Sequence, residues 1–238
     1  DVEMLLKEGG HLARRRTGGG SVYHDLGNLN FSFIADKKIF DVNLQMTVIQ
    51  KALLNYGLET EVSGRNDITY QGRKFSGNAF AKTKYQGLHH GTILIKTDGE
   101  KLQKYLKVKP AKLHKHGVKS VASRVINLSE VADITSENII PYLIKAFEEV
   151  YDNKAIVINF DDLCTEEVLK LKDHISSDEY LFGKWREFHT QKSDTFDWGS
   201  VDIDLDIDED KGIIENIGIA SDSLEPAAIK AAMELLKG

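Results

Sequence analysis

The sequence predicts an α+β protein, in which mixed, largely antiparallel sheets are flanked by helices and followed by a small β-β-α domain. Two observations indicate this fold class. Between residues 60 and 97, short strand-like segments are joined by glycine-containing turns, which favours antiparallel pairing. Along the rest of the chain, helices and strands follow one another in a mixed order. This is not the regular alternation of a doubly wound parallel sheet.

The first half of the chain combines helical and strand-like periods. Asp41 is a suitable N-cap for a helix that closes near Gly57, because residues 42, 46, 49 and 53 are apolar and share one helical face. Gly9 and Gly10 indicate the end of an earlier helix. The elements expected here are a helix end at 2–7, strands at 11–16 and 30–35, a helix at 42–56, strands at 68–70, 74–81 and 91–95, and a helix at 100–106.

In the second half, the sequence pattern changes after about residue 178. Before that point we expect a helix at 136–151 with Pro141 in its first turn, a strand at 155–160, and a helix capped by Thr165. The stretch VDIDLDID at 201–208 alternates strictly, which predicts a strand with an apolar face and an acidic face. A second strand at 213–220 and an amphipathic helix at 224–237 complete a β-β-α unit.

The composition of the 238 residues limits the possible functions. A net charge of −6 argues against a general binder of nucleic acids or anionic membranes, so we expect neither partner. One cysteine, Cys164, excludes an internal disulfide framework. No run approaches the roughly 18 apolar residues of a membrane span, and we expect no signal peptide and a cytoplasmic protein. The chain opens in mid-pattern without Met, and residues are expected to be missing at the front.

Three consecutive glycines stand out in the stretch RRRTGGGSVYHDLGNLN at 14–30, just before a predicted strand. Glycine loses more conformational freedom on folding than any other residue, so this run has a cost that must be offset. One explanation is a hairpin connection. The other is a loop whose bare N–H groups approach an anion, with arginines completing the site. The glycines alone leave both explanations open.

Two further polar clusters follow at strand ends, GRNDITYQGRKFSGNAF at 64–80 and HHGTIL at 89–94. Lys74 lies in a segment that otherwise resembles buried sheet, where a compact cation can meet a transferring oxyanion. The adjacent histidines are typical of a polar strand end, and no third ligand stands at a recognisable metal-site spacing. Taken together, the glycine backbone, Arg15, Arg16, Lys74 and several amides suit a substrate that passes through a phosphoanhydride.

The ordered motifs RRRTGGGSVYHDLGNLN, GRNDI, KFSGNA, HHGTIL and SVASRVINLSE resemble the lipoate–protein ligase family, which shares its fold with biotin protein ligases and octanoyltransferases. The resemblance covers about residues 9–130 and resumes at FDWGSVDI, which is similar to the start of the family's C-terminal accessory domain. It implies a catalytic domain over 1–178, without the strand–helix region with which the family normally begins. The start of the accessory domain is then expected at 190–238.

The activity implied by this resemblance is ATP-dependent lipoate–protein ligation. The lipoate carboxylate attacks the α-phosphorus of ATP, pyrophosphate leaves, and lipoyl-AMP forms. The ε-amine of a lysine on a lipoyl domain then attacks the mixed anhydride, and AMP leaves. The implied cofactors and substrates are ATP, Mg²⁺ and lipoate. The implied partners are lipoyl domains of 2-oxo-acid dehydrogenase acyltransferase subunits and the glycine-cleavage H protein, and we expect a monomer.

The resemblance also implies roles for individual residues. Lys74 matches the lysine that contacts the acyl carbonyl and the α-phosphate, and Arg16 matches an arginine beside the lipoyl and phosphate groups. His24 matches a histidine that orders the glycine loop. Asp67 is a candidate Mg²⁺ ligand, and Lys112 lies in a stretch that resembles the adenylate-binding loop. The other residues expected to bind lipoate or adenylate are Arg15, Gly18, Gly19, Gly20, Asn66, Ser76, Gly77, Ala79, His90, Gly91, Ser123 and Arg124.

Three alternative functions remain. A carrier-to-carrier octanoyl or lipoyl transferase that works through a thioester needs a cysteine near the acyl pocket, whereas Cys164 lies among acidic residues far from the motifs. A biotin ligase interleaves glycine with arginine, unlike TGGG. A non-catalytic module that binds lipoyl domains is a different class, and the presence of Lys74 argues against it. Lipoate-dependent exchange of pyrophosphate into ATP discriminates among these functions.

Overall fold

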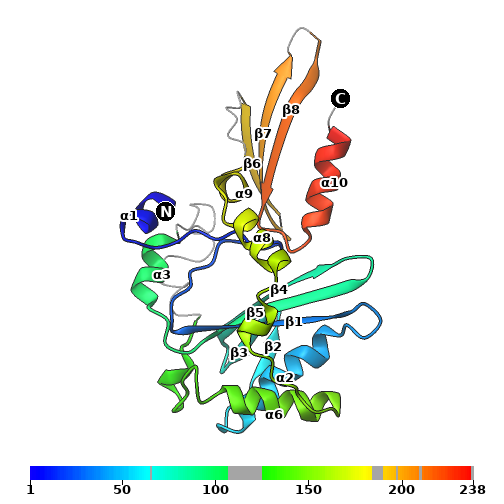
Figure 1. The fold of residues 1–238 in the computed structure, drawn as a ribbon. Coiled ribbons are helices and arrows are strands. Elements are labelled where there is room, and N and C mark those ends of the chain that lie inside the picture. Colours follow the sequence, from blue (N-terminus) through cyan, green and yellow to red (C-terminus); the bar gives the residue numbers. More distant parts are fainter. Residues whose placement is uncertain (65, 107–124, 184–189, 197, 209–210, 237–238) are drawn as a thin grey trace. The chain divides into compact units, whose positions relative to one another are not determined.

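The computed structural model describes residues 1–238 except 65, 107–124, 184–189, 197, 209–210 and 237–238 (Figure 1). Contacts divide the chain into two compact units. The first unit contains Asp1 and residues 22–157, and the second contains residues 2–21 and 158–238. The predicted domain boundaries at residues 178 and 190 stay a prediction. Among the residues described, no helix is both long enough and apolar enough to cross a membrane.

A five-stranded sheet forms the centre of the first unit, with the strand order β1-β5-β4-β3-β2. Every neighbouring pair is antiparallel, which confirms the predicted largely antiparallel sheet. The short β2 was not predicted, because its three residues are exposed and carry no apolar alternation. The strands are β1 (Asn28–Asp36), β2 (Glu61–Ser63), β3 (Asp67–Tyr70), β4 (Arg73–Lys82) and β5 (Gln86–Leu94).

Helices cover one face of this sheet (Figure 1). The helix α2 (Val42–Leu54) begins at the predicted N-cap, where the Asp41 carboxylate accepts hydrogen bonds from two backbone N–H groups. Its buried residues Met46, Ile49 and Leu53 pack with Phe75 of β4 and with apolar residues of β3 and β5. The helix α6 (Ile140–Tyr151) packs on α2. The core therefore lies between the sheet and α2.

Among the described residues, the first unit also contains the helix α3 (Gly99–Tyr105) and the 3₁₀ turn η1 (Leu128–Glu130). The predicted helix at 100–106 is thus confirmed within one residue. The helix predicted at 136–151 begins four residues late, at Ile140, with Pro141 in its first turn. Proline is tolerated there because the first N–H groups of a helix have no partner within the helix.

The second unit contains a three-stranded antiparallel sheet in the order β6-β7-β8. The predicted pair of strands and the following helix are confirmed, but the unit has a further strand, β6, whose polar sequence lacks apolar alternation. Thr165 caps α8 as predicted, by accepting a hydrogen bond from the backbone of Val168. The elements are α1 (Val2–Lys7), α7 (Phe160–Leu163), α8 (Glu166–Ile175), α9 (Asp178–Phe182), β6 (Thr190–Phe196), β7 (Gly199–Asp208), β8 (Ile213–Ser221) and α10 (Pro226–Leu236).

Two predicted strands are wrong. Residues 11–16 form no strand, because the Arg15 guanidinium bends back to the carbonyls of Gly18 and Gly20. Residues 155–159 also have no regular structure, and α7 begins at Phe160. Their apolar residues suggested a strand, but a strand requires a neighbour that accepts and donates its ladder hydrogen bonds. Among the described residues, this segment has no such neighbour.

Candidate active site

Lys74 projects from β4 on the face of the five-stranded sheet that is opposite to α2. Its Nζ lies 2.7 Å from Oδ1 of Asp67 on β3, and the two side chains are 37% and 34% exposed. The backbone of Lys74 is also fixed, because its carbonyl accepts a hydrogen bond from the N–H of Ile126 at 2.9 Å. The lysine therefore has a firm backbone and a side chain that solvent and ligand can reach.

Gly77 provides the space that the Lys74 side chain occupies. A Cβ added to Gly77 would lie 2.9 Å from Nζ and 3.0 Å from Cε of Lys74. Residues three apart on a regular strand face opposite sides, yet here a bulge pairs Asp67 with Gly77 and Thr69 with Lys74. The bulge thus brings Lys74, Asp67 and Gly77 together. The bulge explains why Lys74 and Gly77, the first and last residues of KFSG, lie on the same face of the sheet.

Two more of the predicted residues share this face. Ala79 is two residues beyond Gly77 on β4, and its cross-strand partner on β5 is His90. Thr92, which was not predicted, accepts a hydrogen bond from the Gly77 N–H through its hydroxyl at 3.2 Å. The structure therefore brings together five predicted residues on one polar sheet face: Asp67, Lys74, Gly77, Ala79 and His90.

Ser76 and Gly91 lie on the other face, toward α2. Ser76 is fully buried, and its hydroxyl accepts a hydrogen bond from the Asn78 side chain at 3.3 Å. A Cβ on Gly91 would lie 2.5 Å from the Phe31 ring and 2.4 Å from Oδ1 of Asn78. Gly91 is therefore required by packing inside the unit. A role for either residue in ligand binding stays a prediction, and it would involve the backbone.

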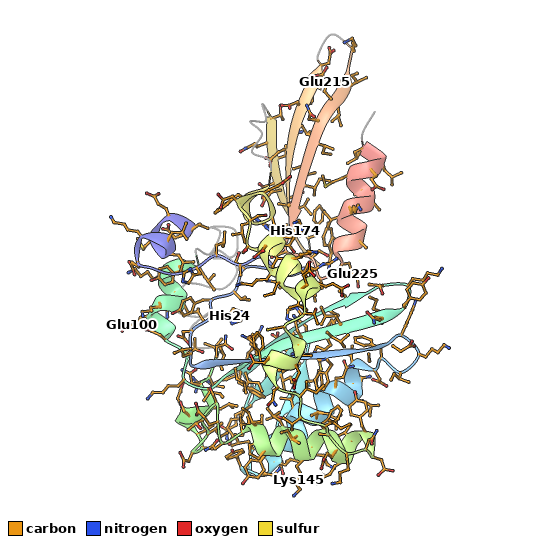
Figure 2. All side chains as sticks on the ribbon, viewed as in Figure 1. His24, Glu100, Lys145, His174, Glu215 and Glu225 are labelled. Atoms are coloured by element: carbon orange, nitrogen blue, oxygen red, sulfur yellow. The ribbon has the colours of Figure 1, made fainter. Side chains whose placement is uncertain are left out.

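His24 lies in an exposed loop of the first unit, and Figure 2 labels it. Its Nδ1 is 3.0 Å from Nδ2 of the buried Asn28. The neighbouring Asp25 accepts hydrogen bonds from the N–H groups of Gly27 and Asp98, at 2.9 and 2.8 Å. These contacts hold the HDLGN segment against the start of α3. The predicted role of His24 in ordering the glycine loop stays a prediction.

The glycine loop belongs to the second unit, where it contacts the chain itself. The Gly19 N–H donates to the carbonyl of Ser223 at 2.8 Å, and a Cβ on Gly18 would lie 2.3 Å from the same oxygen. Gly19 has a φ of +102°, which favours glycine. Arg15 donates to the carbonyls of Gly18 and Gly20, and burial lowers the pKa of its guanidinium. The fold of the second unit thus requires glycine at positions 18 and 19. The predicted approach of a nucleotide to this loop stays a prediction.

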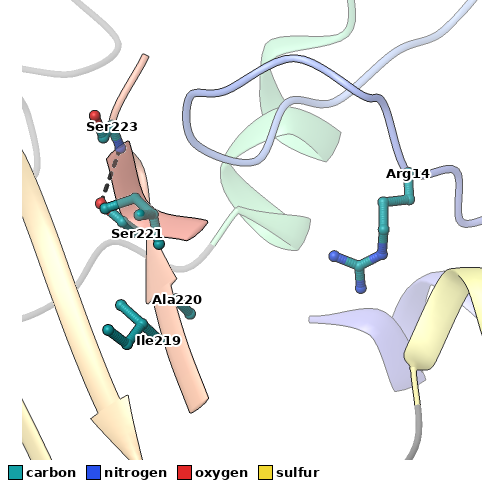
Figure 3. Close-up of a pocket in the computed structure, with 6 residues that line it drawn as sticks. Arg14, Ile219, Ala220, Ser221 and Ser223 are labelled. Atoms are coloured by element: carbon teal, nitrogen blue, oxygen red, sulfur yellow. Dashed lines mark hydrogen bonds between the residues drawn. The ribbon is translucent and has the colours of Figure 1, made fainter. Parts of the chain in front are cut away.

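A cavity of about 290 Å³ lies in the second unit near this loop (Figure 3). The Arg14 guanidinium lines it and donates hydrogen bonds to the carbonyl of Leu181. Across from Arg14, the Ser223 N–H donates to the Ser221 hydroxyl at 3.1 Å. The lining residues are Arg14, Ile219, Ala220, Ser221, Ser223 and Ile229. None of these lining residues was predicted as a site residue. Arg16, which was predicted as a site residue, is exposed and does not line this cavity.

The predicted adenylate-binding loop with Lys112, and also Ser123 and Arg124, lie outside the described residues. Among the residues that are described, no group of three or more His, Cys, Asp or Glu side chains could hold a metal ion. The predicted Mg²⁺ ligand Asp67 is therefore a single carboxylate. Mg²⁺ is commonly held by one or two carboxylates together with substrate phosphates, so this donor fits a Mg²⁺ that arrives with a nucleotide.

His89 is the residue whose place the sequence reasoning missed. Both histidines of HHGTIL were interpreted as a polar strand end, but His89 is fully buried on the α2 side. Its ring contacts the Gln45 side chain through Nδ1 at 3.0 Å and the Asn78 side chain through Nε2 at 2.8 Å. Burial, together with the charge of His90, lowers its pKa to about 4. Alternation with Ile93 could have identified His89 as the buried member of the pair.

Family models and curated proteins match this chain. The family model described as Lipoyl protein ligase A/B catalytic domain matches residues 1–148, and the model described as Bacterial lipoate protein ligase C-terminus matches residues 186–238. A lipoate-protein ligase A from Bdellovibrio bacteriovorus is 37% identical over 100% of this chain and 72% of its own length. One from Psychrobacter cryohalolentis is 37% identical over 99% of this chain and 71% of its own length.

Solved structures extend the likeness to the fold. P. falciparum LipL1 in complex with lipoate has a TM-score of 0.84 and 31% identity, over 100% of this chain and 70% of its own. The bipartite lipoate protein ligase of Thermoplasma acidophilum, solved with its E2 lipoyl domain, has a TM-score of 0.67 and 30% identity, over 80% of this chain and 77% of its own. A lipoate-protein ligase A bound with ATP has a TM-score of 0.65 and 28% identity, over 78% of this chain and 77% of its own. The chain therefore belongs to the lipoate–protein ligase family.

Proposed function

We propose that the chain activates lipoate with ATP to lipoyl-AMP and transfers the lipoyl group to a lysine of a lipoyl domain. The ATP-dependent ligase activity follows from membership of the family. The observation that supports the assignment of the site is the position of Lys74. This side chain lies beside Gly77 on a polar sheet face and is paired with Asp67 at 2.7 Å.

The first step suits a lysine in this setting. A lipoate carboxylate oxygen bonds to the α-phosphorus of ATP while the bond to pyrophosphate breaks, so negative charge develops on the phosphoryl oxygens. The three N–H donors of Lys74 can stabilise that charge. Its pair with Asp67 is partly exposed, and such pairs are weak. Lys74 can therefore exchange the carboxylate for a phosphate at small cost.

The second step places similar demands on the site. The lysine amine of the lipoyl domain bonds to the acyl carbon of lipoyl-AMP, the bond to AMP breaks, and the amine loses a proton as the amide forms. Charge develops on the acyl oxygen, where Lys74 again serves as a stabilising cation. No covalent intermediate with the protein is needed. The contribution of the chain is therefore mainly positioning and charge stabilisation.

Mg²⁺ completes the proposed set of cofactors. When bound, it neutralises charge on the phosphates of ATP. Asp67 would hold it from the protein side, together with phosphate oxygens. Release of Asp67 from Lys74 would accompany the arrival of the nucleotide, since the carboxylate and the lysine then each gain a partner of opposite charge. Residues of the glycine loop and the 107–124 segment are the proposed adenylate contacts.

The proposed acceptors are lipoyl domains, as in the complex of the Thermoplasma ligase with its E2 lipoyl domain. We propose lipoyl domains of 2-oxo-acid dehydrogenase acyltransferase subunits and the H protein of glycine cleavage. A cytoplasmic monomer stays the expectation. The alternative transfer through a cysteine thioester is disfavoured, because Cys164 is the only cysteine and lies far from the motif residues in the sequence.

The test is exchange of labelled pyrophosphate into ATP with and without lipoate. Exchange that requires lipoate supports adenylate formation, and subsequent labelling of a lipoyl domain in the presence of ATP supports the transfer step. A chain that moves lipoyl or octanoyl groups from a carrier protein without ATP would contradict the proposal. Binding of a lipoyl domain with neither exchange nor labelling would instead support the non-catalytic module.

A further inference from the structure

The buried His89 lies in a cage of aromatic rings on the α2 side of the sheet. The ring centroids of Phe31, Phe33 and Phe80 are 5.5, 5.7 and 4.8 Å from that of His89, and the histidine is fully buried. A polar ring in such surroundings is stable only if its nitrogens are hydrogen-bonded. The two polar neighbours are Gln45 on α2 and Asn78 on β4.

The orientation of Asn78 determines which nitrogen of His89 carries the proton. The Asn78 amide nitrogen donates to the carbonyl of Asn66 at 3.0 Å and to the hydroxyl of Ser76 at 3.3 Å. Its oxygen must then face His89, where it lies 2.8 Å from Nε2. Because a carbonyl oxygen only accepts, Nε2 is the donor. A neutral ring therefore has an unprotonated Nδ1.

Because Nδ1 of His89 is an acceptor, the Gln45 side chain has to present a hydrogen-bond donor to it. With its oxygen toward Nδ1, two acceptors would face each other at 3.0 Å. The buried Gln45 amide nitrogen, which has the Tyr151 hydroxyl near it, would make no hydrogen bond of good geometry in the described part of the chain. Exchanging the amide oxygen and nitrogen solves both problems, since the nitrogen then donates to Nδ1. The lowered pKa of His89, about 4, agrees with a neutral ring.

The other end of this network reaches the candidate active site. Asn78 and Asn66 are joined by three hydrogen bonds: the Asn78 backbone and side-chain nitrogens both donate to the Asn66 carbonyl, at 2.8 and 3.0 Å, and the Asn66 side chain donates back to the Asn78 carbonyl at 2.7 Å. Asn66 directly precedes Asp67, which pairs with Lys74. A displacement of Asn78 would therefore move Asp67.

We propose that His89 and Asn78 are positioning residues for lipoate activation. In this arrangement Gln45 donates to neutral His89, His89 donates to Asn78, and Asn78 fixes the Asn66–Asp67 turn. That turn sets the position of the Asp67 carboxylate beside Lys74 and beside the incoming phosphates. His89 touches no reacting atom. This inference rests on the proposed role of Lys74, because it states what holds the Asp67–Lys74 pair in place. Misplacement of a catalytic group by about 1 Å can lower the rate by about 10²-fold.

The test compares two substitutions of His89 in the full chain. His89→Phe fills the aromatic cage but removes the donor to Asn78, whereas His89→Gln retains a donor at the position of Nε2. The expected kcat of lipoate-dependent exchange falls by about 10- to 10²-fold in His89→Phe, with KM for ATP and lipoate nearly unchanged. His89→Gln is expected to recover most of the loss. Phe80→Leu, which alters the same cage without touching a hydrogen bond, should lower thermal stability and retain kcat.

A spectroscopic measurement is independent of activity. Nitrogen-15 NMR of the wild-type imidazole at pH 7 is expected to show one neutral ring with the proton on Nε2. An imidazolium, or a proton on Nδ1, would overturn the network even if the variants fail to fold. A folded His89→Phe with wild-type kcat would overturn the positioning role. By contrast, a wild-type chain without lipoate-dependent exchange would overturn the proposed function itself, whatever the NMR spectrum shows.

Discussion

Lys74 and Asp67 form an ion pair between β4 and β3, with Nζ 2.7 Å from Oδ1, directly above the position where Gly77 lacks a side chain. Both side chains are about one-third exposed, and exposed pairs contribute little to folding stability. The pair is thus better suited to holding a lysine ready for an anion than to stabilising the sheet.

Removal of the lysine is expected to stop catalysis and leave the fold intact. Lys74→Ala should lower lipoate-dependent exchange by about 10²- to 10³-fold, since one charge-stabilising group is lost. The free energy of unfolding should change by less than about 1 kcal/mol, because the pair with Asp67 is exposed. The control is Lys82→Ala at the exposed end of the same strand, where Nζ lies over the Phe40 ring. Near-wild-type turnover by folded Lys74→Ala would rule out the assignment.

Gly77→Ala tests the space beside the lysine. The added Cβ would lie 2.9 Å from Lys74 Nζ, so the flexible end of the lysine must move while the backbone stays. We expect exchange to fall at least about tenfold, with stability changed by less than about 1 kcal/mol. Gly99→Ala, where an added Cβ meets no atom within 4 Å, is the matched control. Equal activity of the two variants would show that Lys74 does not need its present position.

Much of the fold was predictable because its signals are local. The N-cap Asp41 and the apolar face of α2 identified that helix, and the turn glycines identified β3, β4 and β5. The strand β6 and the unpaired segment 155–159 were not predictable, since the first lacks alternation and the second depends on a neighbour that sequence periodicity does not report.

The sequence motifs identified residues of the candidate site, but they did not predict how the fold brings these residues together. Motif order found Lys74 and Asp67, yet the bulge that brings them together depends on pairing between β3 and β4. The glycine run suggested a ligand, whereas the space beside Gly18 is taken by Ser223, which is distant in the sequence. The space beside Gly19 is taken by Arg15, a nearby residue that was itself predicted to bind the ligand. Close packing between distant segments is what a single sequence does not reveal.

Gly18→Ala is expected to destabilise the second unit. Its Cβ would lie 2.3 Å from the carbonyl oxygen of Ser223 and 2.9 Å from the backbone of Leu224, so backbone must shift. Overpacking of this kind costs about 1–3 kcal/mol, to be measured by denaturant unfolding of the full chain. Gly20→Ala should be nearly neutral, because the nearest atom, Cβ of Asp222, is 3.8 Å away. If both variants unfold like the wild type, the contact with Ser223 is not part of the folded state in solution.

His89 should make stability depend on pH. Its pKa is lowered from 6.5 to about 4, so in this window the unfolded chain binds a proton that the folded chain does not. The contribution of neutral His89 is fully present above pH 6.5 and is lost as the pH falls toward 4, by roughly 3 kcal/mol. Unfolding free energies of wild type and His89→Phe should therefore converge or cross as the pH is lowered. Parallel curves from pH 7 to 4 would mean that the ring is not held neutral.

Asp67→Asn distinguishes a metal ligand from a partner of Lys74. The substitution retains the shape and removes the charge. If Asp67 holds Mg²⁺ together with the phosphates, the Mg²⁺ concentration at half-maximal exchange should rise by about tenfold or more. If Asp67 only orients Lys74, kcat should fall while the dependence on Mg²⁺ stays as in the wild type. Asp36→Asn removes a carboxylate at the far end of β1 and controls for net charge. We expect the first result, because a phosphate would attract Lys74 away from Asp67 and leave that carboxylate available to the ion.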